Sequence, residues 1–145
     1  MCSRAPCAKA RCSMSDPKQA RILLEAAERD FFALRGMDDA AVFADEIFGF
    51  HAQQAAEKLF KAWLSLMGES YPPTHDLVEL MEILTPRQPE AARFDGLIDY
   101  TPYAVQFRYG PADAGAAPLD RDSAVGLAAA LLEEVRRRLT RAESL

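Results

Sequence analysis

The sequence predicts an all-α fold: a single antiparallel bundle of four or five helices. Apolar residues recur every three or four positions in several segments, which is the period of a helix with one buried face. The segments are joined by short stretches that contain proline or glycine, and no second strand exists to pair with the one alternating segment. With 145 residues, half of them hydrophobic, the chain suits one domain with one core.

The first helix is expected over residues 17–35. Asp16 is a good N-cap, Pro17 suits the first helical position, and Gly36 is placed to end the helix. One face of this segment is apolar, and it consists of Ala20, Leu23, Ala27, Phe31 and Leu34.

The second helix is expected to be long, from about residue 39 to residue 67, with Asp38 or Asp39 as its cap and Gly68 as its stop. Gly49 in its interior indicates a bend or a close approach. Two apolar stripes follow its second half, which predicts packing on two sides, against the bundle and against a second copy of the chain. The stripes are Phe48, Ala52, Ala55, Leu59, Ala62 and Leu66, and Ala56, Phe60, Trp63 and Met67.

Two shorter helices are expected next. Thr74 is the predicted cap of a third helix that Thr85-Pro86 ends, and Pro89 can open a fourth that Thr101-Pro102 ends or kinks. The apolar residues of these helices are Leu77, Leu80, Met81 and Leu84, and then Ala92, Phe94, Leu97 and Ile98.

After residue 102 the pattern changes. Residues 103–109 are read as a helix end or an ordered loop, and residues 110–119 as a loop. The last helix is expected from Asp120 or Asp122 to Arg141. The arginines near its end indicate a solvated helix terminus rather than a nucleic-acid patch.

Residues 1–15 are expected to be a disordered basic leader, and residues 16–143 the folded domain. The leader lacks the apolar stretch of a secretory signal, and Met14 leaves the true start codon open. All three cysteines lie in the first 12 residues, so a disulfide framework is excluded for the domain, which suits a reducing cytoplasm. Their spacing matches no standard zinc motif.

Charge and motifs exclude several classes of function. Residues 14–145 keep all 22 acidic residues and lose three of the 17 basic ones, so their net charge is −8 and bulk nucleic-acid binding is not expected. No apolar run approaches the roughly 20 residues of a membrane-spanning helix. With two histidines, no phosphate-binding loop and no nucleophile motif, the sequence predicts neither a metal site nor a cofactor.

A polar strip crosses the otherwise apolar second helix. Its residues share one side of the helix and are His51, Gln54, Glu57, Lys58 and Lys61. Glu57 and Lys61 are spaced for an ion pair. The strip is either a functional groove or a solvated edge with satisfied interhelical contacts, and both readings stay open. His75 and Asp76 open the third helix, where Asp76 can also serve as a cap.

The string FHAQQAAEKLFKAWL (residues 50–64), followed by THDL (residues 74–77) and FRYGP (residues 107–111), resembles the HEPN family, the higher eukaryotes and prokaryotes nucleotide-binding domain. The resemblance implies an antiparallel four-helix up-and-down bundle with a fifth helix, in a homodimer. It also implies a partner, a minimal nucleotidyltransferase, with which such proteins form toxin–antitoxin-like pairs.

Many proteins of that family are metal-independent ribonucleases that use an Arg-x(4–6)-His motif, which this sequence lacks. It is similar instead to the branch of nucleotidyltransferase partners with a nucleotide-binding groove. Carried over residue by residue, the ligand-binding candidates are His51, Gln54, Glu57, Lys58, Lys61, His75, Asp76, Arg108 and Tyr109. If the protein is a ribonuclease, His75 and Arg108 are the catalytic candidates; the other alternative is a purely structural dimeric interaction module.

Overall fold

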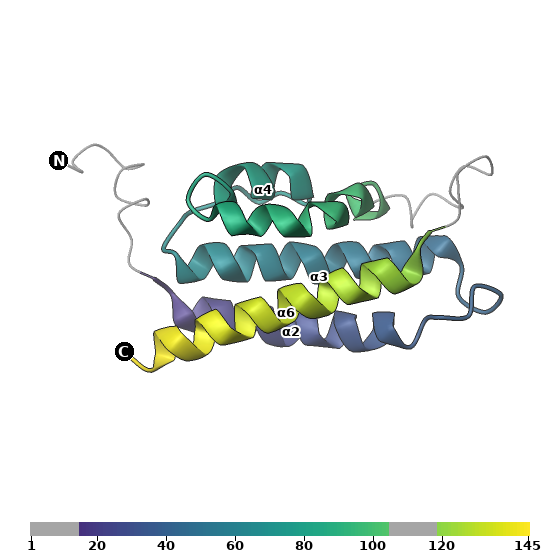
Figure 1. Cartoon of the computed structure of the whole chain (residues 1–145), viewed down its shortest axis with the longest axis horizontal. Helices are drawn as coiled ribbons and strands as arrows, with labels where there is room; N and C mark the ends of the chain where they lie inside the picture. The colour runs from purple at the N-terminus through teal and green to yellow at the C-terminus, as the bar shows by residue number, and fades with distance from the viewer. Residues whose placement is uncertain (1–14, 105–118) are drawn as a thin grey trace.

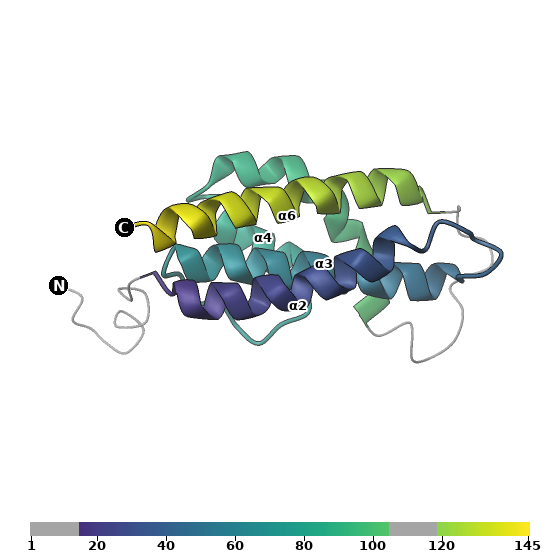
Figure 2. The same cartoon turned by 90° about the horizontal axis from the view of Figure 1, so that it is seen from below.

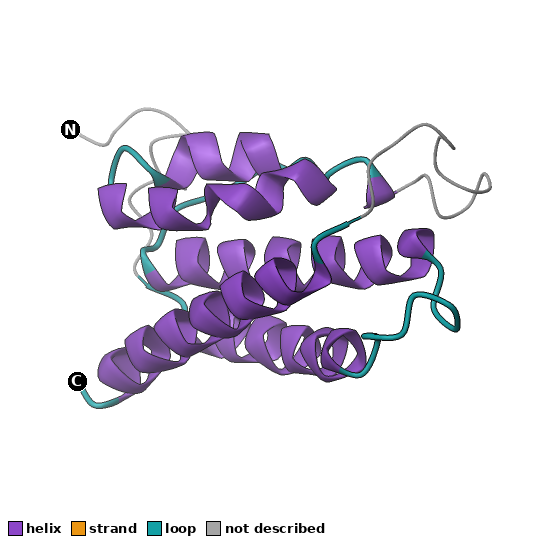
Figure 3. Cartoon of the chain, turned by 45° about the vertical axis from the view of Figure 1, so that its right-hand side comes forward, coloured by secondary structure: helices purple, strands orange, loops and turns teal. Residues whose placement is uncertain are grey.

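The structure, a computed structural model, describes residues 15–104 and 119–145. Its helices are α2 (Pro17–Arg35), α3 (Asp45–Leu66), α4 (Leu77–Leu84), the 3₁₀ helix η1 (Pro89–Tyr100) and α6 (Arg121–Glu143). The described part contains no strand (Figure 3), so the prediction of an all-α fold is confirmed. Outside the described residues lie residues 1–14 of the predicted leader and residues 105–118. The second range includes most of the predicted loop and the candidates Arg108 and Tyr109.

The three long helices lie side by side, and the two short ones cover another face of α3 (Figure 1). Helix α3 contacts all the others, while α2 and α6 pack on each other and η1 also reaches α6. The beginning of α2 and the ends of α3 and α6 meet at one end of the bundle (Figure 2). Helix α3 is therefore the central element, and its polar side chains can reach segments on either side.

Helix α2 has the predicted bounds. The carboxylate of Asp16 accepts a hydrogen bond from the backbone N–H of Gln19 at 3.1 Å, as an N-cap does. On the buried face, Leu24 takes the place that the sequence assigned to Leu23, which is only partly buried. The buried position at this turn is therefore one residue later than predicted. The apolar face of α2 packs against α3 and α6.

Helix α3 begins at Asp45, so the prediction of a start near residue 39 was wrong. The carboxylate of Asp39 accepts from the N–H of Ala41 at 2.9 Å and stabilises a turn instead of capping the helix. Arg121 of α6, nearly buried, donates to the carbonyl oxygens of Met37 at 3.0 Å and Phe43 at 2.7 Å. These hydrogen bonds from Arg121 hold the connection between α2 and α3 as a loop, although Arg121 lies far along the chain from it.

Both apolar stripes of α3 are buried within a single copy of the chain. Eight of their ten residues are fully buried, and Leu66 and Met67 are partly buried. Contacts with α2 and α6 on one side and with α4 and η1 on another account for this burial. The inference of a dimer from these stripes was therefore wrong in its premise, because the short helices supply the second packing surface.

Gly49 marks a close approach, one of the two predicted alternatives. A Cβ atom at this position would lie 2.4 Å from the ring of Tyr103. Only glycine lets that ring rest on the backbone of α3. The contact holds the chain against α3 just after the end of η1.

The two short helices differ from prediction in their caps and type. Asp76, whose carboxylate accepts from the N–H of Val78 at 2.9 Å, caps α4, whereas Thr74 accepts from the N–H of Asp76. Element η1 begins at Pro89 as predicted but is a 3₁₀ helix. Its buried residues recur at every third position, which is the 3₁₀ period; they are Ala91, Phe94, Leu97 and Tyr100.

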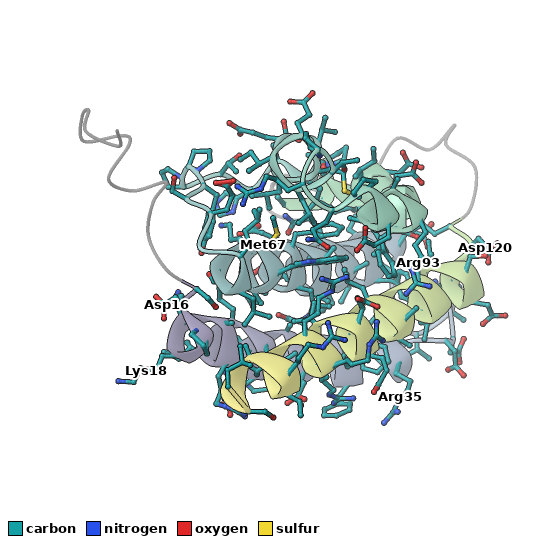
Figure 4. The ribbon with its side chains drawn as sticks, turned by 60° about the vertical axis from the view of Figure 1, so that its left-hand side comes forward. Asp16, Lys18, Arg35, Met67, Arg93 and Asp120 are labelled. Atoms are coloured by element: carbon teal, nitrogen blue, oxygen red, sulfur yellow. The ribbon has the colours of Figure 1, made fainter. Side chains whose placement is uncertain are left out.

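Helix α6 begins after Asp120, which accepts from the N–H of Ser123 at 3.1 Å. Its arginines are not simply a solvated end. Arg138 is four-fifths buried, lies over the Trp63 ring at 4.5 Å and donates to Glu134 of its own helix and to Gln88 and Glu90 near the start of η1. Arg93 of η1 also reaches Glu134, and Figure 4 shows Arg93 beside α6.

Candidate functional site

A polar network centred on Glu57 joins α3 to the segment before α4. Glu57 follows Gln53 by one turn and precedes Lys61 by another, so the three side chains share one face of the helix. Lys61 donates to Glu57 Oε2 at 2.8 Å, as the sequence spacing predicted, and Gln53 donates to Glu57 Oε1 at 2.8 Å. The residues Gln53 and Glu57 are buried, so their polar groups are satisfied by one another rather than by water.

His75 is the exposed end of this network. Its Nδ1 atom lies 3.0 Å from Glu57 Oε1, while 69% of the side chain remains exposed. Gln53 also donates to the backbone carbonyl of His75 at 3.0 Å. Both the ring and the backbone of His75 are thus held from α3, and the edge that carries Nε2 is directed away from the carboxylate.

The carboxyl group of Glu57 stays ionised despite its burial. Burial by itself raises the pKa of Glu57, but hydrogen bonds from Lys61, Gln53 and His75 outweigh that effect and leave the pKa below its ordinary value. The network therefore keeps a negative charge behind the imidazole of His75.

A second network joins α3 to α2. Asp30 accepts from Lys58 and lies 3.1 Å from Nδ1 of His51. The carboxylate is mostly buried, whereas the lysine and the histidine are each about a quarter exposed. Burial raises the pKa of Asp30, but the bonds from His51 and Lys58 leave it below its ordinary value.

The structure thus divides the predicted strip between two networks on neighbouring sides of α3. His51 and Lys58 face α2, and Glu57 and Lys61 face the segment before α4. Gln54 adjoins the Glu57 network, because its side-chain amide donates to Oε1 of Gln53 at 2.7 Å. Asp76 is a helix cap, and Arg108 and Tyr109 lie outside the described residues.

Sequence reasoning missed Asp30 and Gln53. Asp30 directly precedes the buried Phe31, so a polar residue at the edge of the buried face of α2 was the available signal. Gln53 lies within the string that suggested the strip, but its full burial was not visible from its residue type.

The comparisons with known proteins give a family. The model of the HEPN domain matches residues 18–139, a span that includes most of α2, all of α3, α4 and η1, and most of α6. The chain belongs to the HEPN family. No curated protein and no solved structure matches it.

Both networks of this HEPN domain lie within the matched span. Each consists of one histidine, one carboxylate and one lysine: His51 with Asp30 and Lys58, and His75 with Glu57 and Lys61. In each, the carboxylate contacts Nδ1 and so orients the ring. An imidazole held in this way can donate a hydrogen bond to a phosphate oxygen or exchange a proton with a bound group.

Across residues 15–104 and 119–145, no group of three or more histidine, cysteine or acidic side chains is arranged to hold a metal ion. Among the helices that the structure describes, none is both long and apolar enough to cross a membrane.

Proposed function

We propose that this HEPN protein is a partner of a minimal nucleotidyltransferase and that it holds a nucleotide phosphate at the His75 surface. One observation carries the proposal: an exposed imidazole is anchored on a buried network of Glu57, Gln53 and Lys61. The family supports the partner role, and the pairing would be of the toxin–antitoxin type.

The energetics of the network favour a functional role. A buried carboxylate must be paired and fully hydrogen-bonded, and apolar residues of similar size would stabilise the same contact as well or better. The polar network additionally fixes the orientation of the exposed His75 ring and places the negative charge of Glu57 beside its Nδ1 atom. Pre-organisation of that kind strengthens binding because less freedom is lost when a ligand arrives.

The second network supplies a fixed cation on the adjacent side of α3. Lys58 is held by Asp30 and is partly exposed, so its ammonium group is already positioned when a phosphate arrives. His51 lies beside it on the same carboxylate. The proposal assigns the phosphate to His75 and leaves Lys58 to strengthen binding of the nucleotide or of the partner.

The proposal includes a homodimer, as the family resemblance implies. Because both stripes of α3 are already buried, the contact must use another face. Ile22 and Phe32 of α2, 62% and 50% exposed, are candidates for it. Sedimentation at micromolar concentration measures the assembly, and a monomer would contradict this part of the proposal.

The binding proposal is tested by titrating ATP into the protein and into His75→Ala and Lys58→Ala variants by calorimetry. Lys18→Ala is the matched control, because Lys18 is exposed at the start of α2 (Figure 4) and belongs to neither network. We expect a loss of about 1–3 kcal/mol in binding for a charge-assisted hydrogen bond, with thermal stability retained for His75→Ala. Loss of stability without loss of binding would instead indicate a structural interaction module.

A second candidate function is a metal-independent ribonuclease. The observation that favours it is the pair of His75 and Glu57, since a carboxylate-oriented imidazole is a suitable general base. The predicted catalytic partner is Arg108. Incubation of the protein with RNA in the presence of a chelator distinguishes the two functions: cleavage that is lost in both His75→Ala and Arg108→Ala supports the enzyme, and intact RNA supports the partner.

A further inference from the structure

A separate cavity lies at the end of the bundle where α2 begins and where α3 and α6 end. Figures 1 and 2 place these three helix ends together, and Figure 4 shows Asp16 and Met67 on this side of the molecule. The backbone N–H of Asp16 bonds the carbonyl of Ser65 at 2.8 Å, which ties the start of α2 to the end of α3. The cavity has a volume of about 240 Å³ and shares no residue with the two polar networks.

Most of its lining is apolar. Leu66 ends α3 and Met67 follows it, while Ala142 lies in the last turn of α6 and Leu145 comes just after that helix. The fully buried Trp63 also lines it, and Trp63 is the only tryptophan of the chain. These side chains offer a surface for one planar apolar group. The volume is below the roughly 300–1,000 Å³ of sites for drug-sized ligands, so a single ring is the suitable size.

The indole of Trp63 carries a buried donor. Within the described part of the chain, its Nε1 atom has no hydrogen-bond acceptor, although buried donors are normally paired. The ring face is covered by the guanidinium of Arg138 and its neighbour Phe94 meets it edge-on. Trp63 therefore brings an unpaired N–H to the set of residues that line the cavity.

The cavity also has cations. Arg138 is engaged by Glu134, Gln88 and Glu90, but no side-chain contact in the described part involves Arg141, which is exposed at the rim. The carbonyls at the end of α3 are already bonded by the amides of the residues that follow, which weakens their repulsion of an anion. Arg141 is therefore available for a negatively charged group.

We propose that this cavity binds a small aromatic carboxylate, a single ring with one acid group. The ring packs on Leu66, Met67 and Leu145, and the carboxylate forms a bidentate pair with Arg141. The chemistry differs from that of the His75 surface, because an apolar body is required here and a phosphate is not. The inference is thus independent of the proposed function.

The test uses the full-length protein labelled with ¹⁵N and titrated with benzoate. Because the chain has one tryptophan, its indole N–H gives a single side-chain resonance that reports from the cavity wall. We expect a saturable shift of that resonance. Benzamide, which has the same shape without the charge, should bind about tenfold more weakly, a difference of about 1.4 kcal/mol.

Two arginine variants complete the test. Arg141→Ala should weaken benzoate binding about tenfold, equivalent to about 1.4 kcal/mol, and remove the preference over benzamide. Arg29→Ala is the matched control, since Arg29 is also exposed and without a side-chain contact in the described part, and it should bind as the unmodified protein does. Absence of a saturable indole shift, or equal binding by the two variants, overturns the proposal.

Discussion

The Nδ1 atom of His75 lies 3.0 Å from Oε1 of Glu57, and this contact joins a segment outside the helices to the middle of α3. Gln53 contacts both residues, since it donates to the carboxylate of Glu57 and to the carbonyl of His75. The exposed ring and the buried carboxylate therefore form one unit. Changes at Glu57 should affect stability and ring orientation together, whereas changes at His75 should affect the surface.

The first prediction follows from the burial of Glu57. Glu57→Gln keeps the shape and one acceptor but removes the charge that pairs with Lys61, which is itself mostly buried. We expect a loss of about 1–3 kcal/mol in the free energy of unfolding, measured with urea at pH 7. The control is Glu25→Gln, because Glu25 is half-exposed and lies 3.7 Å from Arg21. That change should stay within about 0.5 kcal/mol; equal losses for the two variants would contradict the prediction.

Acid should destabilise the protein through its buried carboxylates. Burial raises the pKa of Asp30, Glu57 and Glu134, but bonds from lysine, arginine, histidine or glutamine bring each below its ordinary value of 3.8 or 4.5. As the pH falls, the unfolded chain therefore binds protons before the native one does. Stability is fully present above about pH 5–6 and is lost progressively as the pH falls through the ordinary values and then the native ones.

Urea unfolding between pH 7 and pH 3 measures this dependence. Glu134→Gln should flatten the curve at its acidic end, since it removes one of the three groups whose pKa is lowered. A variant whose pH dependence equals that of the unmodified protein would show that Glu134 titrates alike in the native and unfolded chains.

A third prediction concerns the contact of Gly49 with Tyr103. An added Cβ would lie 2.4 Å from the aromatic ring, so Gly49→Ala must displace Tyr103. We expect a loss of about 1–3 kcal/mol in the free energy of unfolding, as for other overpacked sites. In a Tyr103→Ala background the same change should be neutral or should stabilise by about 0.5–1 kcal/mol, because alanine is the better helix former.

The double-mutant cycle decides the cause. A loss that persists without the tyrosine ring would point to the helix backbone rather than to the close approach.

The elements that sequence predicted well are those whose signals are local. The caps Asp16 and Asp120 and the apolar period place α2 and α6 within two residues of their observed bounds. The start of α3 could not be placed, because Arg121, more than seventy residues away, holds the preceding loop. Tertiary contacts of this kind override local helix preference.

The sequence placed several residues of the two networks on one side of α3, but it did not show Asp30, Gln53 or how the charged groups of different elements pair. The strip on α3 contained Lys58, Glu57 and the partners His51 and Lys61. The pairing of Lys58 with Asp30, however, depends on the rotation of α2 against α3. Likewise, the helix period showed that α3 is apolar on two sides but not which partner covers each side. The second partner is the pair α4 and η1 rather than a second copy.

The last prediction separates Arg138 from the other arginines of α6. Its guanidinium donates to Glu134 at 2.5 Å, Gln88 at 3.0 Å and Glu90 at 2.9 Å, and it lies over Trp63. A lysine keeps the charge but lacks the planar fork that makes these contacts together, so Arg138→Lys should cost about 1–3 kcal/mol in the free energy of unfolding. The fluorescence emission of Trp63, the single tryptophan, should shift because the guanidinium group no longer covers its ring. Arg137→Lys is the control, because Arg137 is half-exposed and, among the described residues, forms an ion pair only with Glu134, so it should stay within about 1 kcal/mol. If both variants are equally stable, Arg138 belongs to the solvated helix end after all and does not fasten α6 to η1.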